Sequence, residues 1–330
     1  MKKLLFLCSI VLLCLSAKAQ INLNDGSWKC VLDEQFDEEA SYWDWDTKRF
    51  LNEGDYSWKS YLGTIAPKGE REIYQFGNCQ INTTDHTMHL VAYYDSINIH
   101  RNNYYLPKWM KKSNGGKGYP DSDGRFYFSG ALQYYKQHYV KKEEDRMFQY
   151  GYFEIRCKLP THKGAFPAFW LQHSSDVEGK KFYDEIDIFE YSWWITSPES
   201  PNRNTPGIGS KRCYTCGLYH NDTDNTYRDN SYGRVYPTIP SNSTDLDEYH
   251  TFACEWMPDH VIWYFDGIVM NEYHEKENIP QRPMYLKVNY AIDSYYRHGG
   301  TKWTGTDEMV IDYIKVYQKA SPKRKIRARH

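Results

Sequence analysis

The stretch GYFEIRCKL, residues 151–159, alternates between apolar and polar side chains along its whole length. The odd-numbered positions from Phe153 to Leu159 are apolar, whereas the even-numbered positions carry Tyr, Glu, Arg and Lys. A period of two is typical of a β-strand because successive side chains of an extended chain point to opposite faces. The stretch therefore predicts a strand with one face buried in a core and the other in water.

Short apolar segments recur along the chain, and no sustained helical periodicity lies between them. The pairs Pro258-Asp259 and Asp266-Gly267 are typical of the turns of β-hairpins. Many evenly spaced strands without intervening helices predict an all-β protein, a β-jelly-roll sandwich of two packed antiparallel sheets. We expect further strands at residues 130–135, 166–172, 185–191, 251–257, 260–265, 268–273, 285–292 and 309–318.

Two longer and more polar segments interrupt this pattern, at residues 95–127 and 195–247. On a sandwich, such segments are expected as loops at the rim, where binding specificity usually resides. The chain contains no internal repeat and no linker that would divide it. We therefore expect a single β-sandwich domain at residues 20–319.

The N-terminus reads MKKLLFLCSIVLLCLSAKAQ, with a basic start, an apolar run from Leu4 to Leu15 and an Ala-Lys-Ala sequence ending at Ala19. This three-part pattern predicts a secretory signal peptide at residues 1–19. A membrane anchor is the weaker alternative because the run is shorter than the ~20 residues of a spanning helix. A lipid-modified Cys14 is disfavoured by the bulky leucine before it. We expect a secreted or periplasmic protein without a membrane span.

Cleavage after Ala19 would leave 330 − 19 = 311 residues, which suits one large domain. Loss of the three leader lysines would change the formal charge from −2 to −5. A mildly acidic chain without a basic stripe argues against nucleic acid as a partner. The one basic cluster lies in residues 320–330, which we expect to be a solvated tail. We expect the protein to be a monomer.

The cysteines and two short motifs bear on whether the chain holds a metal site. Cys157 and Cys254 lie in apolar strand-like runs and are expected as small buried hydrophobes. Cys213 and Cys216 form a lone C-x-x-C, which favours a local disulfide or free thiols over zinc. His274-Glu275 begins like a zinc-protease helix but lacks the second histidine. Disulfide pairing stays open among the six cysteines that follow the leader, Cys30, Cys79, Cys157, Cys213, Cys216 and Cys254.

The segment DEIDIFEY, residues 184–191, places three carboxylates, Glu185, Asp187 and Glu190, among isoleucine and phenylalanine. In a strand, Glu185 and Asp187 share a face, whereas Glu190, five residues after Glu185, would point the other way. A bulge of one extra residue would return Glu190 to the face of the other two. Bulges are over-represented next to active sites, so the spacing predicts a functional bulge.

Folding alone gives no reason to align like charges on one strand face. Crowded carboxylates do not all ionise easily, so one can stay protonated as a general acid while its neighbour stays ionised and attacks. Two acids in those roles are the equipment of glycoside hydrolysis. The alternatives are a solvated acidic edge strand and a structural calcium site.

The acidic segment and several neighbouring stretches resemble a known enzyme family. The sequence from Glu185 to Glu190 resembles the bulged E-x-D-x-x-E signature of glycoside hydrolase family 16, as in laminarinases, agarases, porphyranases and carrageenases. The resemblance implies a jelly roll with a concave substrate cleft, and it covers roughly residues 32–318. Supporting matches are YGYFEIRCKLP at 150–160, GAFPAFWL at 164–171, YHTFACEWMPDHVIWYFDG at 249–267, VNYA at 288–291 and IDYIKVYQ at 311–318.

The resemblance implies that Glu185 is the nucleophile, Glu190 the acid/base and Asp187 the residue that tunes the nucleophile. The reaction would then retain anomeric configuration, with the two glutamate carboxyls about 5 to 5.5 Å apart. The resemblance also implies that catalysis would require no cofactor.

Sugar-contacting residues are expected among aromatic and polar side chains near the signature, because sugar C–H faces stack on aromatic rings. The candidates are Trp170, Tyr183, Trp193, His220, Asn289 and Trp303. The rim departs from the family pattern: Phe166 replaces a tryptophan, and a Gly-Gly pair is displaced to residues 299–300.

Many members of this family also bind a structural calcium on the convex face. The resemblance implies a matching site at the Asp312 carboxylate with backbone carbonyls near Gln35 and His86, since calcium prefers oxygen ligands.

The sequence thus predicts a secreted, retaining endo-acting glycoside hydrolase that cleaves a β-linked polysaccharide through a covalent glycosyl-enzyme intermediate. The polysaccharide is a β-glucan or a marine galactan, with a weak preference for glucan. The alternatives are a transglycosylase on the same scaffold and a non-catalytic, lectin-like carbohydrate-binding protein.

Overall fold

The computed structural model describes residues 21–37, 43–44, 49–51, 57–60, 72–96, 125–135, 147–162, 165–177, 180–192, 213–221, 231–235, 248–292 and 305–320. The expected signal peptide and nearly all of the basic tail lie outside these residues. Within the described ranges the regular elements are β-strands and two 3-10 helices, with no α-helix.

The strands follow one another along the whole described chain. Their bounds are β1 Trp28–Glu34, β2 Trp43–Asp44, β3 Arg49–Leu51, β4 Ser57–Ser60, β5 Glu72–Tyr74, β6 Cys79–Asn82, β7 Thr87–Ser96, β8 Arg125–Ser129, β9 Ala131–Tyr135, β10 Gly151–Lys158, β11 Ala165–Val177, β12 Lys180–Ser192, β13 Cys213–Asn221, β14 Ser231–Val235, β15 His250–Met257, β16 His260–Phe265, β17 Ile268–Tyr273, β18 Tyr285–Ile292 and β19 Thr306–Lys319. The 3-10 helices are η2 Phe76–Asn78 and η5 Lys276–Asn278.

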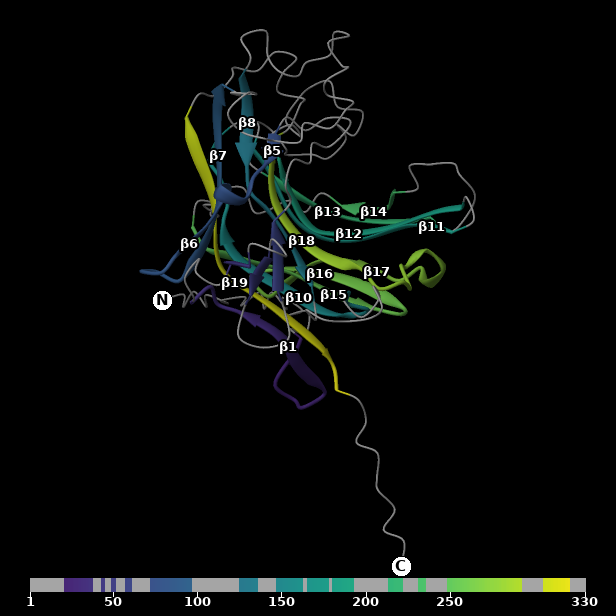
Figure 1. Cartoon of the computed structure of the whole chain (residues 1–330). Coiled ribbons are helices and arrows are strands. Elements are labelled where there is room, and N and C mark those ends of the chain that lie inside the picture. The colour runs from purple at the N-terminus through teal and green to yellow at the C-terminus, as the bar shows by residue number, and fades with distance from the viewer. Residues whose placement is uncertain are drawn as a thin grey trace, which may run out of the picture.

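These strands form two sheets, which confirms the expected sandwich. Sheet A has the order β17-β16-β15-β10-β19-β7-β8-β5, with β1 paired to β19 and β6 to β7. Sheet B has the order β14-β13-β12-β11-β18-β9-β4-β3-β2. Figure 1 shows β11, β12 and β18 of sheet B lying over β10, β15 and β16 of sheet A. The parallel pair of β5 and β8 is an exception to the antiparallel arrangement that the sequence predicts.

The alternating stretch that predicts the fold forms β10, a central strand of sheet A between β15 and β19. Phe153, Ile155 and Cys157 are fully buried between the sheets, as their period of two requires. The opposite face of β10 is less exposed to solvent than the sequence predicts. Tyr152 packs there in a second, smaller apolar cluster with Trp28 and Tyr264.

The main core lies between the two sheets and is rich in aromatic side chains. Phe189 of β12 and Phe252 of β15 meet across the interface with ring centroids 4.5 Å apart. Burial of this apolar surface stabilises the sandwich, because each large side chain contributes about 1.5 to 3 kcal/mol when it leaves water. β12 is therefore anchored by its core face, and its other face is available for polar side chains.

The hairpin turn between β16 and β17 forms at the Asp-Gly pair that predicts it. Asp266 and Gly267 have φ angles of 47° and 74°, and two positive φ values are what a type I′ hairpin turn requires. The expected strands at 260–265, 268–273 and 285–292 have the predicted bounds.

The expectation that residues 95–127 and 195–247 are loops is wrong in part. β13 and β14 lie within the second segment, and β7 and β8 reach into the ends of the first. β13 has the sequence CYTCGLYHN, in which Thr, His and Asn interrupt the apolar signal. Its alternate residues Cys216 and Leu218 are nonetheless buried in the core, so tertiary pairing with β12 makes it a strand.

Free thiols occupy the core where the sequence left disulfides open. Cys157 and Cys254 are buried and free, which confirms them as small hydrophobes. Cys216 is also buried and forms no disulfide, so the local disulfide considered for the C-x-x-C pair is absent. Cys30 and Cys79 likewise form no disulfide.

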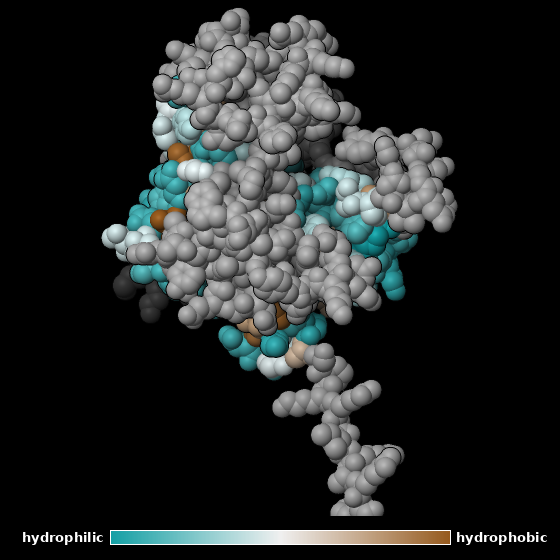
Figure 2. All heavy atoms as spheres, in the orientation of Figure 1, coloured by the Kyte–Doolittle hydropathy of each residue, from teal (hydrophilic) through white to brown (hydrophobic). Residues whose placement is uncertain are grey.

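The described part of the surface that faces the viewer in Figure 2 is mostly hydrophilic. Figure 2 shows hydrophobic colour only in scattered spots on the side in view. Among the described side chains, Ile268 is the one large apolar residue that is exposed. In the same ranges there is no helix with the length and apolar character needed to cross a bilayer.

Candidate active site

The bulge predicted within the acidic segment is present in β12. On β11, Phe169 and Trp170 are consecutive, but their partners on β12 are Phe189 and Asp187, so Ile188 is the extra residue. Both Ile188 and Phe189 pack in the core between the sheets. Two consecutive core-facing residues reverse the alternation of the strand, which is how a bulge re-aims the residues after it.

The three carboxylates share one face of sheet B as a result. Glu185, Asp187 and Glu190 are paired with Gln172, Trp170 and Ala168 of β11, which are spaced two residues apart. Directly paired residues of antiparallel strands point to the same side, and residues two apart on a regular strand share a face. The partners on β13 are Tyr219, Gly217 and Thr215, again two residues apart. We call this side of sheet B the carboxylate face.

A tryptophan from sheet A holds the bulge. The indole N–H of Trp263 on β16 donates a 2.9 Å hydrogen bond to the backbone carbonyl of Asp187, directly before the extra residue. A bulge disrupts the local ladder, and a buried carbonyl without a partner is costly. Trp263 is itself buried, so the core of the sandwich supports the geometry of the acidic strand.

Asp187 and Glu185 differ in their surroundings. The Asp187 side chain is 2% exposed, whereas Glu185 and Glu190 are half-buried. The hydroxyl of Tyr183 donates a hydrogen bond to Oε2 of Glu185. Tyr183 lies two residues before Glu185 on β12, so the structure brings this predicted residue to the carboxylate face.

Trp170 and Asn289 also meet on the carboxylate face. The indole N–H of Trp170 donates to Oδ1 of Asn289 at 2.7 Å, and Nδ2 of Asn289 donates to the hydroxyl of Tyr74 at 3.0 Å. Trp170 is half-buried beside Asp187 in the strand register. The three side chains therefore form a hydrogen-bonded row that fixes the orientation of the indole.

Sequence reasoning missed Lys287, Gln172 and Tyr74. Lys287 lies two residues before Asn289 on β18, so strand alternation from Asn289 would have placed it on the same face. Its ammonium group donates to Oε1 of Gln172 and lies 4.5 Å from the centroid of the Trp170 ring. Burial lowers the pKa of Lys287 to about 8, although the negative charge of Glu185 acts to raise it. Tyr74 comes from sheet A, and no local sequence signal connects it to Asn289.

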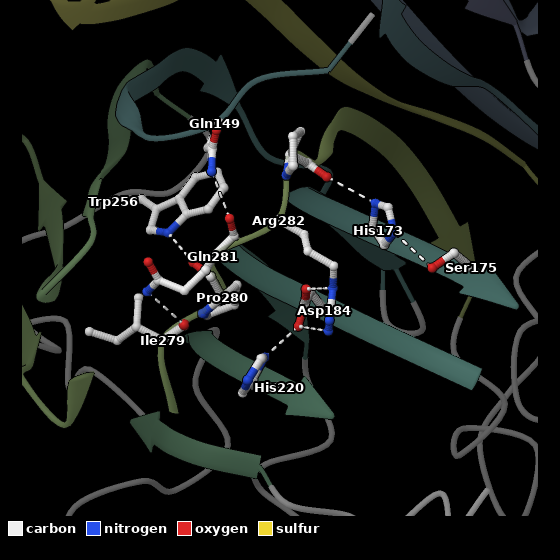
Figure 3. Close-up of polar contacts among 11 residues, drawn as sticks. Gln149, His173, Ser175, Asp184, His220, Trp256, Ile279, Pro280, Gln281 and Arg282 are labelled. Atoms are coloured by element: carbon white, nitrogen blue, oxygen red, sulfur yellow. Dashed lines mark hydrogen bonds and ion pairs between the residues drawn. The ribbon is translucent and has the colours of Figure 1, made fainter. Parts of the chain in front are cut away.

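His220 does not join the carboxylate face, which corrects its place among the sugar-contacting candidates. It is paired with Asp184, and its Nδ1 lies 2.6 Å from Oδ1 of that carboxylate. Asp184 precedes Glu185 and therefore points to the opposite side of β12. Its carboxylate is fully buried and also accepts a 2.8 Å hydrogen bond from Nε of Arg282, as Figure 3 shows. His220 thus compensates a buried charge on the core side.

Two further candidates, Trp193 and Trp303, lie outside the described residues. Asp312 of β19 is described, and its carboxylate forms an ion pair with Arg156. In the described ranges no group of three or more His, Cys, Asp or Glu side chains is arranged to hold a metal ion. A carboxylate already neutralised by a guanidinium is a poor fit for a calcium ion, which prefers several oxygen ligands. The calcium site stays a prediction.

The carboxylate face combines three acids with a polar and aromatic surround. Several carboxyl groups on one face, beside a half-buried indole, are the kinds of side chain that glycoside chemistry uses.

Comparison with known proteins agrees with this chemistry. Residues 129–315, more than half of the chain, match the family model described as Glycosyl hydrolases family 16. The chain is 22% identical over 298 residues to Glucan endo-1,3-beta-glucosidase A1 of Niallia circulans, covering 85% of this chain and 36% of that protein. It is 24% identical over 301 residues to Kappa-carrageenase of Pseudoalteromonas carrageenovora, covering 85% of this chain and 62% of that protein.

Among solved structures, the laminarinase catalytic domain from Thermotoga maritima MSB8 matches with a TM-score of 0.58 and 21% identity, covering 89% of this chain and 100% of that chain. This likeness shows the fold. The chain spans about a third of the Niallia relative and less than two thirds of the Pseudoalteromonas relative.

Proposed function

The chain belongs to glycosyl hydrolase family 16, and we propose that it is an exported, retaining endo-glycosidase that cleaves a β-linked polysaccharide. The observation that carries the proposal is the shared face of Glu185, Asp187 and Glu190, which depends on the extra residue Ile188. The leader pattern at residues 1–19 supports export.

In the proposed first step, protonated Glu190 donates its proton to the glycosidic oxygen while the Glu185 carboxylate attacks the anomeric carbon. The C–O bond to the leaving sugar breaks, and an ester bond to Glu185 forms. In the second step the Glu190 carboxylate removes a proton from water, the water oxygen attacks the anomeric carbon, and Glu185 leaves as a carboxylate. Two inversions give net retention, and no cofactor takes part.

Asp187 is proposed to tune the nucleophile, since its nearly buried carboxylate lies between the two glutamates in the strand register. Trp170 and Asn289 are proposed to contact the sugar. The substrate class is a β-glucan or a marine galactan, and the names of the Niallia and Pseudoalteromonas relatives support one choice each.

The test compares the wild type with Glu185→Gln and with Glu308→Gln, an exposed carboxylate of sheet A, on laminarin, lichenan, agarose, porphyran and carrageenan. We expect the wild type and Glu308→Gln to release reducing ends from one of these polymers, with β-configured first products by NMR. Glu185→Gln should be folded and inactive. Full activity of Glu185→Gln would refute the assignment, and binding without reducing-end release by the wild type would favour the lectin-like alternative. Sugar transfer in place of hydrolysis would identify a transglycosylase.

A further inference from the structure

Lys287 is a buried lysine on the carboxylate face. It is 8% exposed, and the strand register places it between Trp170 of β11 and Gln133 of β9. Lysine is almost never buried unless it is paired, because an ammonium group loses its hydration there. Burial of the Lys287 ammonium group therefore lowers the stability of the folded protein, and the fold itself gives no reason for a lysine at this position.

The ammonium group of Lys287 contacts residues that lie next to Glu185, the proposed nucleophile. It donates to Oε1 of Gln172, which is paired directly with Glu185 across the β11–β12 ladder. It also lies over the ring of Trp170, which is paired with Asp187. One cation thus contacts the side chains opposite two of the three carboxylates.

The charged and titratable groups around Lys287 are mainly acids. β12 supplies Tyr183 and the three carboxylates to this face, and β18 itself supplies Tyr285. The described side chains of β11 and β9 beside Lys287 are Gln172, Trp170 and Gln133, none of which titrates. Glu185 is the charge that acts most on Lys287, and the attraction between the two is mutual.

We propose that Lys287 is a positioning residue for Glu185. The Lys287 ammonium group keeps the Glu185 nucleophile ionised and holds the adjoining Gln172 and Trp170 in place. The inference rests on the proposed function, because it assigns the role of nucleophile to Glu185. Without the cation, three carboxylates would share one face with no counter-charge from Lys287, and Glu185 would take up a proton more readily.

The experiment measures kcat and KM against pH for the wild type, Lys287→Met, Lys287→Arg and Lys315→Met. Methionine removes the charge with little change in length, and arginine retains it. Lys315 is the matched control, because its amine lies 4.7 Å from the ring centroid of Tyr313 and 3.5 Å from Asp33, but on sheet A. Circular dichroism checks that each variant is folded, and Lys287→Gln replaces Lys287→Met if the latter does not fold.

We expect Lys287→Met to lower kcat at least tenfold, with KM changed about twofold or less. The acidic limb of its kcat/KM profile should move upward by about one pH unit, since an opposite charge nearby lowers a carboxyl pKa by about one to three units. Lys287→Arg should keep the acidic limb of the wild type, and Lys315→Met should match the wild type throughout.

An unchanged acidic limb in folded Lys287→Met would overturn the inference. An equal loss of kcat in the methionine and arginine variants, with no shift of the acidic limb in either, would overturn it as well. Glu185→Gln separates this failure from failure of the proposed function. If Glu185→Gln is inactive while the Lys287 profiles do not move, only the role of Lys287 is wrong. If Glu185→Gln is fully active, the proposed function fails as well.

Discussion

Ile188 and Phe189 are consecutive on β12, yet both side chains lie in the core between the two sheets. A regular strand would send one of them to the opposite face. Because both face inward, Glu190 returns to the side of Glu185 and Asp187, and the site depends on a packing event in the core.

Deletion of Ile188 tests the bulge directly. The deletion reduces the spacing from Glu185 to Glu190 by one, so regular alternation alone would keep all three acids on one face. We expect measurable activity together with a loss of about 2 to 5 kcal/mol of stability from the missing core side chain. Deletion of Ile186 is the matched control, because it also removes one buried isoleucine but sends Glu185 and Asp187 to opposite faces. Activity per folded molecule should vanish in that control, and equal activities would contradict the prediction.

The support that Trp263 gives to the bulge predicts a selective effect on rate. Trp263→Phe removes the indole donor to the Asp187 carbonyl, so the bulge should shift and kcat should fall about tenfold or more, as a misplacement of catalytic groups does. Trp256→Phe is the control, since Trp256 is also buried on sheet A and donates to a backbone carbonyl, that of Pro280, at 2.9 Å. Both variants should lose comparable stability in urea unfolding. A similar fall of kcat in both would show that the bulge contact has no special role.

The Arg282–Asp184 pair predicts a large loss of stability on the core side of β12. Arg282→Met removes the guanidinium from the fully buried carboxylate of Asp184 and leaves its contact with His220, and we expect a cost of about 3 kcal/mol. Arg156→Met provides the comparison, because Arg156 and Asp312 are about one-third exposed and such pairs contribute at most about 1 kcal/mol. Denaturant unfolding at pH 7 measures both, and equal losses would be inconsistent with the buried pair.

The lowered pKa of Lys287 predicts that its replacement stabilises the protein. The folded-state pKa is about 8, against 10.5 for an ordinary lysine, so the unfolded state binds more protons between these values. The cost to folding is complete below pH 8 and disappears as the pH rises through 10.5. We expect Lys287→Met to be more stable than the wild type by up to about 3 kcal/mol at pH 7. The difference should shrink between pH 8 and 10, and a less stable variant at pH 7 would contradict the prediction.

The row of Trp170, Asn289 and Tyr74 predicts a graded effect on substrate affinity. Trp170→Phe keeps an aromatic face but removes the donor to Asn289, whereas Trp170→Ala removes both. Since an aromatic contact is worth about 0.5 to 1.5 kcal/mol, KM should rise about two- to tenfold in the alanine variant and less in the phenylalanine variant. Steady-state kinetics on the polymer that the wild type cleaves would measure this, and an unchanged KM in Trp170→Ala would exclude a sugar contact.

Local sequence patterns were sufficient for much of the fold. The period of two in GYFEIRCKL predicts the central strand β10, and the Asp-Gly pair predicts a turn whose two positive φ angles are found. The five-residue interval between Glu185 and Glu190 predicts the bulge, because a strand cannot bring both to one face without it. These features depend on covalent geometry over a few residues, so they can be read from neighbours in the chain.

Tertiary packing was needed for the rest. The polar composition of β13 does not predict a strand, and this segment is a strand because it pairs with β12. His220 lies on the core side of this ladder because it is paired with Asp184. Lys287 and Tyr74 reach the site from strands more than one hundred residues away from Glu185 along the chain. Sequence alone specifies which residues alternate and where the alternation breaks. Which distant side chains meet at that break, and which charge each acid meets there, is decided when the two sheets pack, because those contacts join residues with no local pattern in common.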